Sequence, residues 1–256
     1  MSPTGRVAHR RACDRLERLV WWVGVAAAVG LAARAILKLH WAAVADSWLF
    51  LLQALGTSWL LAIVSILVGA VAALPLALAR VYGPIGLRHA AILLIEAVRA
   101  TPELMIIFWV YFTSPVLLGN EISSWNAALA SLAVIAAAYL AEVIRAGLYS
   151  VPRGQSIASA ATGMRPFQTF RYVVLPQALR NMLPAVVAQL VALFKATSLV
   201  YAIGVMEFFR AVSVTNNAIF APYELYIIMG AGYFVSCFAI TRLVRYFNPK
   251  YQLLDG

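Results

Sequence analysis

Residues 57–79 read TSWLLAIVSILVGAVAALPLALA and contain no charged side chain. The hydrocarbon core of a bilayer is about 30 Å thick, so a helix needs about 20 mostly apolar residues to cross it. This stretch has that length, and it ends at Arg80, after which Gly83, Pro84 and Gly86 favour a turn. The segment therefore predicts a membrane-spanning helix.

The composition extends this interpretation to the whole chain of 256 residues, of which 63% are apolar and 12% are charged. A mean hydropathy of +0.85 is too high for a soluble domain. Inside lipid every backbone amide must bond within its own segment, and the apolar stretches are too long and too uniform for barrel strands. We expect an all-α, polytopic bundle with about six transmembrane helices.

The first of these helices is expected at residues 19–39, after an arginine-rich start. It is interpreted as an uncleaved anchor because the later helices need a fixed orientation. The alternative is a cleaved signal, since Ala33-Arg34-Ala35 loosely resembles a cleavage site. Residues 46–56 are expected to form a short amphipathic segment along the outer surface. The remaining spans are expected at residues 100–118, 125–143, 183–203 and 222–243.

The net charge of +10 does not indicate nucleic acid, because Lys and Arg gather at the ends of apolar stretches. This is the positive-inside pattern, for which anionic lipid headgroups are the counter-charge. Residues 145–180 carry five arginines and no acidic residue, which predicts the principal cytoplasmic loop. We expect an inner-membrane protein with both termini in the cytoplasm. Its expected parts are a tail with the anchor helix (1–45), the membrane domain (46–248) and a tail (249–256).

Catalytic chemistry is not expected. The chain has no GxxxxGK[ST] loop that would cradle phosphates and no G-x-S-x-G nucleophile. His9, His40 and His89 are scattered, and Cys13 lies far from Cys237, so neither a metal site nor a disulfide framework is predicted. We expect no cofactor and no ATP hydrolysis by this chain.

Within the long loop, residues 155–176 read QSIASAATGMRPFQTFRYVVLP. The run of small residues at 158–161 predicts a slim helix that can dock closely into a cleft of another protein. Gly163 suits the left-handed position that ends a helix, and Pro166 suits the first turn of the next helix. The pattern indicates a helix–turn–helix elbow on the cytoplasmic face, although an ordinary structural loop would have a similar composition.

The spacing of this segment resembles the EAA loop of ABC-importer permeases. In that family the motif reads Glu-Ala-Ala, three residues, Gly, nine residues, Ile-x-Leu-Pro. Here the matching words are Ile157-Ala158-Ser159, Gly163 and residues 173–176 (VVLP). Short sequence motifs on either side of this loop match the permeases for polar amino acids of the histidine, glutamine and glutamate type. They extend the resemblance from Leu51 to the C-terminus. These motifs are Glu96-x-x-Arg99-x-Thr101-Pro102, 141–147 (AEVIRAG), 151–155 (VPRGQ), 175–180 (LPQALR), 194–199 (FKATSL) and 202–205 (AIGV).

The resemblance implies a permease subunit that carries a polar amino acid, driven by ATP hydrolysis on a separate subunit. It implies three partners besides the bilayer: a dimer of ATPase subunits, a periplasmic amino acid-binding protein, and a second permease, either a copy or a paralogue. The elbow would be the coupling helix at 157–164. The residues expected to contact the ATPase are Ile157, Ala158, Ser159, Ala160, Ala161, Gly163 and Met164.

Two positions depart from the family pattern. Ile157 stands where the motif has Glu, which removes any polar contact of that side chain and favours pairing with a paralogue that keeps the Glu. Glu103 follows Pro102 where the family usually has an apolar residue.

Charged and polar groups near the spans form two sets. Glu96 and Arg99, like Glu142 and Arg145, are three residues apart and are expected to form structural ion pairs at the cytoplasmic interface. The second set is a candidate substrate pathway, because a zwitterion needs partners for both charges. Alternatives are a snorkelling Lys195 and a Glu207 in an outer loop. The set comprises Lys195, Thr197, Ser198 and Glu207.

Two other functional classes remain as alternatives. An ion-coupled transporter or channel predicts inverted repeats, but only the short words at Glu96 and Glu142 resemble one another. A permease for sugars, peptides or metals would carry different flanking words.

Overall fold

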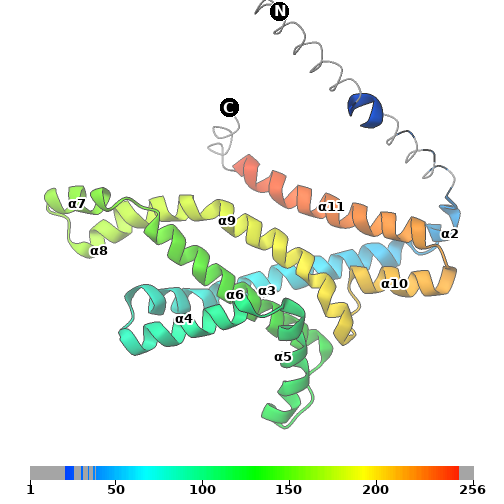
Figure 1. Cartoon of the computed structure of the whole chain (residues 1–256), viewed down its shortest axis with the longest axis horizontal. Helices are drawn as coiled ribbons and strands as arrows, with labels where there is room; N and C mark the ends of the chain where they lie inside the picture. The colour runs from blue at the N-terminus through cyan, green and yellow to red at the C-terminus, as the bar shows by residue number, and fades with distance from the viewer. Residues whose placement is uncertain (1–20, 26–29, 31–33, 35–36, 38, 248–256) are drawn as a thin grey trace, which may run out of the picture.

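The computed structural model describes residues 21–25, 30, 34, 37 and 39–247, and they form an elongated bundle of helices (Figure 1). Within this part of the chain, four helical stretches are long and apolar enough to cross a membrane. They are α3 (Trp48–Tyr82), α6 (Ser124–Tyr149), the continuous helix Pro166–Ile203, and Pro222–Leu243 within α11 (Pro222–Phe247). The predicted all-α membrane fold is confirmed, whereas the count of six spans is not established.

The expected anchor helix at 19–39 lies largely outside the described residues, as do the N-terminal tail with Cys13 and the C-terminal tail. Just before α3, a short helix α2 (Ala42–Ala45) packs Val44 against the outer part of the bundle. The backbone N–H of His40 donates to Glu224 Oε1 in the first turn of α11 at 2.8 Å. The backbone at His40, shortly before α3, is therefore fastened to the last helix.

Helix α3 corrects the prediction of a separate amphipathic segment at 46–56. The helix begins at Trp48 and runs without interruption to Tyr82. Gly56 is the only helix-weakening residue in its first part, and a single glycine costs about 1 kcal/mol, which is too little to end a long apolar helix. The segment is thus the N-terminal part of a helix long enough to span a membrane.

The predicted helix at 100–118 is found as α5 (Glu103–Leu118), although it is shorter than the four spanning stretches, and a separate helix precedes it. Helix α4 (Ile85–Ala100), which the sequence analysis did not predict, ends before Thr101, and α5 (Glu103–Leu118) begins after Pro102. The residue before a proline disfavours the helical conformation, and Thr101 adopts an extended ψ of 137°. Figure 1 shows the consequence, since α5 turns away from the long axis.

After α6 the chain forms α7 (Arg153–Ala161) and α8 (Pro166–Thr169), and α8 then leads into the longest helix. A π-helical turn η1 (Phe170–Val174) precedes α9 (Leu175–Ala196), and the 3₁₀ turn η2 (Thr197–Ile203) follows it. Pro176 lacks an N–H and crowds the preceding turn, which accounts for the wider turn just before it. The predicted span 183–203 is therefore only the C-terminal part of a longer helix.

The core gathers around α6, which crosses the middle of the molecule (Figure 1). The face of α6 that contacts α3 consists of residues with small side chains, so the two helices can approach closely. A Cβ atom on Gly69 of α3 would lie 2.5 Å from the Cβ of Ala136 and 2.9 Å from the carbonyl oxygen of Ala133. Ala136 belongs to a buried apolar cluster that several helices share, and its other members include Leu61, Ile107, Leu132, Leu193 and Val200. The chain then closes with α10 (Phe208–Ile219) and α11.

Candidate functional site

The elbow between α7 and α8 has the geometry expected from its sequence. Helix α7 ends at Ala161, and Gly163 has a left-handed φ of +82°. The N–H of Gly163 donates to the Ala160 carbonyl at 3.0 Å, and the N–H of Met164 donates to the Ser159 carbonyl at 3.2 Å. These two bonds form a Schellman cap, which satisfies the last carbonyls of α7 and favours glycine at this position.

The second arm of the elbow starts at Pro166, the first residue of α8, as predicted. The backbone N–H of Arg165 donates to Gln168 Oε1 at 2.8 Å, which caps this helix. Between the arms, the Ser159 hydroxyl lies 3.1 Å from the Thr169 hydroxyl, and both side chains are buried. The elbow is thus held by two caps and one cross-link between its arms.

The predicted docking residues divide into a buried and an exposed group. Ser159 faces the second arm, whereas Ile157 is 70% exposed and Met164 is 39% exposed. The predicted extent of the docking helix needs a correction, because the helix ends at Ala161 and residues 162–164 form its cap. The small residues Ala158, Ala160 and Ala161 and the turn residue Gly163 are exposed.

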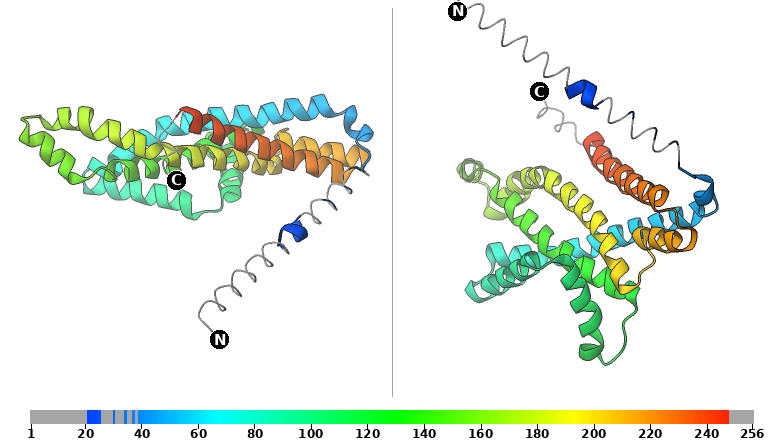
Figure 2. Two further views of the ribbon diagram at one scale, coloured as in Figure 1. Left: turned by 90° about the horizontal axis from the view of Figure 1, so that it is seen from above. Right: turned by 45° about the vertical axis from the view of Figure 1, so that its right-hand side comes forward.

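The elbow forms one end of the molecule. In Figure 1 α7 and α8 lie at the far left, and Figure 2 shows the same end position from two other directions. An open, mainly apolar groove of about 750 Å³ separates α7 from the end of α3, where it is lined by Leu78 and Tyr82. Phe167 and Phe170, just beyond the turn, line the same groove. The elbow is therefore attached chiefly through α6 and α9.

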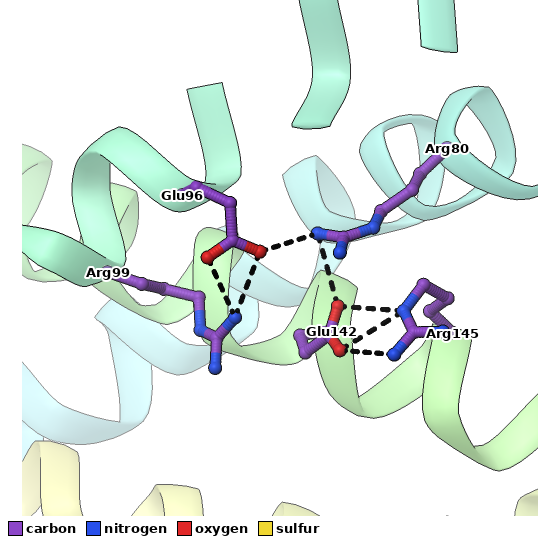
Figure 3. Close-up of polar contacts among 5 residues, drawn as sticks. All are labelled: Arg80, Glu96, Arg99, Glu142 and Arg145. Atoms are coloured by element: carbon purple, nitrogen blue, oxygen red, sulfur yellow. Dashed lines mark hydrogen bonds and ion pairs between the residues drawn. The ribbon is translucent and has the colours of Figure 1, made fainter. Parts of the chain in front are cut away.

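Near the same end, an ionic network joins three helices (Figure 3). Arg80 Nη1 of α3 lies 3.1 Å from Glu96 Oε1 of α4 and 3.2 Å from Glu142 Oε2 of α6. Within α4, Arg99 Nη1 lies 3.2 Å from Glu96 Oε1, and within α6, Arg145 Nη2 lies 2.6 Å from Glu142 Oε1. Both predicted pairs form, and Arg80 connects them.

The network is shielded from solvent to different degrees. The exposed fraction of the side chain is 15% for Arg80 and 20% for Glu142, but 48% for Glu96. Arg99 and Arg145 also lie over the rings of Tyr139 and Tyr149, at 5.6 and 5.5 Å from the centroids. The role of Arg80 was not predicted from the sequence, although its place in the last turn of a long apolar helix was a usable signal.

The candidate pathway residues lie where α9 passes into η2. Lys195 is exposed in the last turn of α9, and its carbonyl accepts a hydrogen bond from the Ser198 hydroxyl at 2.8 Å. Thr197 is fully buried, and its hydroxyl donates to the Phe194 carbonyl at 2.7 Å. In this conformation both hydroxyls bind backbone of their own helix, and the ammonium group of Lys195 is the accessible polar group.

Glu207 is also fully buried, and it caps α10. Its carboxylate accepts from the backbone N–H groups of Phe209 and Arg210, each at 2.8 Å. The hydroxyls of Ser58 on α3 and Tyr233 on α11 lie 3.4 and 3.3 Å from Oε2. The side chain therefore joins α3, α10 and α11 and does not lie in an exposed loop.

Comparison with known proteins adds a family match to this geometry. The family model described as "Binding-protein-dependent transport system inner membrane component" matches residues 65–253. The glutamate/aspartate import permease protein GltK of Escherichia coli O6:H1 is 31% identical over 220 residues, which cover 83% of this chain and 98% of that protein. The nopaline transport system permease protein NocM of Agrobacterium fabrum is 34% identical over 224 residues, covering 82% and 93%.

Solved structures share the fold. A chain of an amino acid ABC transporter with histidines superimposes with a TM-score of 0.78 at 27% identity, covering 83% of this chain and 99% of that chain. A chain of the inward-facing MetNI methionine ABC transporter superimposes with a TM-score of 0.64 at 23% identity, covering 78% and 97%. At 23% identity, the similarity to the methionine transporter chain concerns the fold alone.

Proposed function

The chain belongs to the family of binding-protein-dependent transport system inner membrane components, and on that premise we propose that it imports a polar amino acid as the permease subunit of an ABC transporter. Curated relatives that it matches over most of their length are permeases for glutamate and aspartate, or for nopaline. The flanking words of the EAA-like loop support the same substrate class. Energy comes from ATP hydrolysis on a separate subunit.

The observation that carries the mechanism is the capped elbow around Gly163 at one end of the molecule. The C-terminal part of α7 with its cap, residues 157–164, is the coupling element seated on the ATPase. When two ATPase subunits close around ATP, they draw the elbows of both permeases together. The Ser159–Thr169 contact makes the two arms move as one body, so the displacement reaches α6 and α9.

The ionic network carries this displacement to the rest of the bundle. Helix α6 leads into the elbow, and Glu142 near its end contacts Arg80, which also contacts Glu96. A shift of α6 therefore acts on α3 and α4 through charged contacts. Such contacts suit a switch because they can re-form with new partners at small cost at a partly exposed interface.

The assembly has three further proposed features. A second permease, a copy or a paralogue, completes the translocation path, and a periplasmic amino acid-binding protein delivers the substrate. The chain is a multi-pass protein of the inner membrane, and we propose that both termini lie in the cytoplasm. Residues 46–248 form the transport domain, with 1–45 and 249–256 as flanking segments.

For the substrate path we propose Lys195, Thr197, Ser198 and Glu207, on α9, η2 and the start of α10. Lys195 offers a cation to the substrate carboxylate, while Glu207 shapes the wall through its cap of α10. Replacing Lys195 by Ala should change the selectivity among labelled amino acids, and Lys195→Arg should retain it. Unchanged uptake and selectivity in Lys195→Ala would remove this residue from the path.

The proposed function is tested with the complete complex in proteoliposomes. A panel of labelled amino acids is offered together with the binding protein, and ATP is supplied on the side of the ATPase. We expect uptake of one or a few polar amino acids that stops when the ATPase subunit is omitted. Uptake at the full rate without that subunit would contradict the proposal.

A further inference from the structure

We propose that the elbow selects an ATPase subunit whose docking socket is apolar at its centre, where Ile157 enters, and acidic at its rim. This inference rests on the proposed function and adds the chemistry by which the partner is recognised. It concerns the outward face of α7, the arginines beside it, and the position of both at the end of the molecule.

The outward face of α7 carries a single large apolar side chain. Successive residues of an α-helix are 100° apart, so Ile157 lies on the side of the helix opposite to Ser159, which is buried against the second arm. The exposed residues within about 60° of Ile157 around the helix are Arg153, Gly154, Ala160 and Ala161, and only Arg153 among them is large. Ile157 is therefore the one large apolar side chain on this face; it is 70% exposed, and its neighbours are small except for Arg153.

An exposed isoleucine on a slim helix is suited to a close apolar socket. Burial of such a side chain is favourable, and small neighbours let the helix backbone approach the partner. The motif that this loop resembles has Glu at position 157, which would need a polar partner group instead. The socket for this chain must therefore differ from one that accommodates a carboxylate.

The charged residues around Ile157 are basic. Arg153 lies one turn before Ile157 on α7, and Arg165 follows the turn; both side chains are exposed. The sequence contains no Asp or Glu between Glu142 and Glu207. Neither Arg153 nor Arg165 forms an ion pair with any residue in the described part of the chain. Their complement on a partner is a set of carboxylates around the apolar centre.

The position of the elbow at the end of a long helix favours a protein, and not lipid headgroups, as the partner that binds it. The helix Pro166–Ile203 has 38 residues and is about 57 Å long at about 1.5 Å per residue, against about 30 Å for the hydrocarbon layer. The elbow lies at its end (Figure 1), so this helix can carry the elbow past the headgroups. One isolated apolar side chain such as Ile157 would also add little to the free energy of binding to anionic lipid.

The test measures binding of the cognate ATPase subunit to the purified permease complex at two salt concentrations. The apolar centre is probed with Ile157→Glu, which restores the family residue, and with Ile157→Leu as the matched control. The acidic rim of the socket is probed with the double variant Arg153→Glu and Arg165→Glu, which reverses both charges. Arg88→Glu on the exposed start of α4 is the control. All of these positions are exposed, so the variants should fold, and yield and monodispersity verify this.

We expect Ile157→Glu to raise Kd about tenfold or more, which corresponds to about 1.4 kcal/mol, and Ile157→Leu to leave it unchanged. The double reversal should weaken binding and reduce its salt dependence, whereas Arg88→Glu should not. Equal or tighter binding by Ile157→Glu overturns the inference while leaving the proposed function intact. A double reversal that alters only binding to anionic liposomes also overturns it. Absence of any ATPase binding by the wild type overturns both.

Discussion

Arg80 of α3 and Glu142 of α6 approach to 3.2 Å between Nη1 and Oε2, and the same nitrogen lies 3.1 Å from Glu96 of α4. One guanidinium therefore connects two ion pairs that would each be confined to a single helix without it. Because α6 continues into the elbow, this contact fastens α3 and α4 to the helix that enters the elbow.

Replacing Arg80 by Met should lower the free energy of unfolding by roughly 1–2 kcal/mol. The value lies between those of exposed and buried ion pairs, because Arg80 is well shielded but Glu96 is half exposed. The measurement is thermal unfolding of the permease complex in detergent. Arg88→Met serves as the control, since Arg88 is exposed on α4. If both variants unfold at the wild-type temperature, the network does not stabilise the bundle.

A second prediction concerns the closest approach of α3 to α6. Gly69→Ala should destabilise the protein by about 1–3 kcal/mol, because the new Cβ would lie 2.5 Å from that of Ala136 and 2.9 Å from backbone oxygen. Gly56→Ala on the same helix is the matched control. Nothing lies within 4 Å of a Cβ built there, so this change should be neutral or stabilise by up to about 1 kcal/mol.

Denaturant unfolding of both variants in detergent gives the comparison. Equal stability of Gly69→Ala and Gly56→Ala would contradict the packing described for α3 and α6. The outcome also bears on helix association generally, since small residues provide much of the packing between helices in lipid.

The contact between Ser159 and Thr169 leads to a third prediction. Ser159→Ala should remove about 1 kcal/mol from the closed elbow, and amide exchange at Gly163 and Met164 should become about fivefold faster. Ser156→Ala on the same helix is the control, because the Ser156 hydroxyl makes no hydrogen bond among the described residues. Unchanged exchange in Ser159→Ala would show that the two caps alone hold the arms.

The local structure of the elbow was predictable because its signals are local. Gly163 and Pro166 occupy conformations that few other residues favour, and sequence spacing alone places them around a turn. The same holds for the pairs Glu96–Arg99 and Glu142–Arg145, which one helix brings together in each case.

What the sequence did not predict depends on contacts between helices. Arg80 joins both pairs only because three helices converge, and the Ser159–Thr169 contact requires the particular fold of the elbow. Hydropathy also located the spans better than their ends. It could not distinguish the outer part of α3 from a surface segment, and it did not weigh Pro102 as the break between α4 and α5.

The central claim is that the turn at Gly163 is the docking point of the ATPase. The most direct test compares Gly163→Asp with Gly119→Asp in ATP-dependent uptake by the reconstituted complex. Both glycines are exposed, have positive φ values of 82° and 69°, and have open space where a Cβ would lie. Both substitutions therefore carry a similar backbone strain of roughly 1–2 kcal/mol, and they differ in location.

We expect Gly163→Asp to lower uptake about tenfold or more, equivalent to about 1.4 kcal/mol of docking free energy, and Gly119→Asp to remain close to wild type. Wild-type uptake by Gly163→Asp, in a complex that contains the ATPase subunit, would contradict the account.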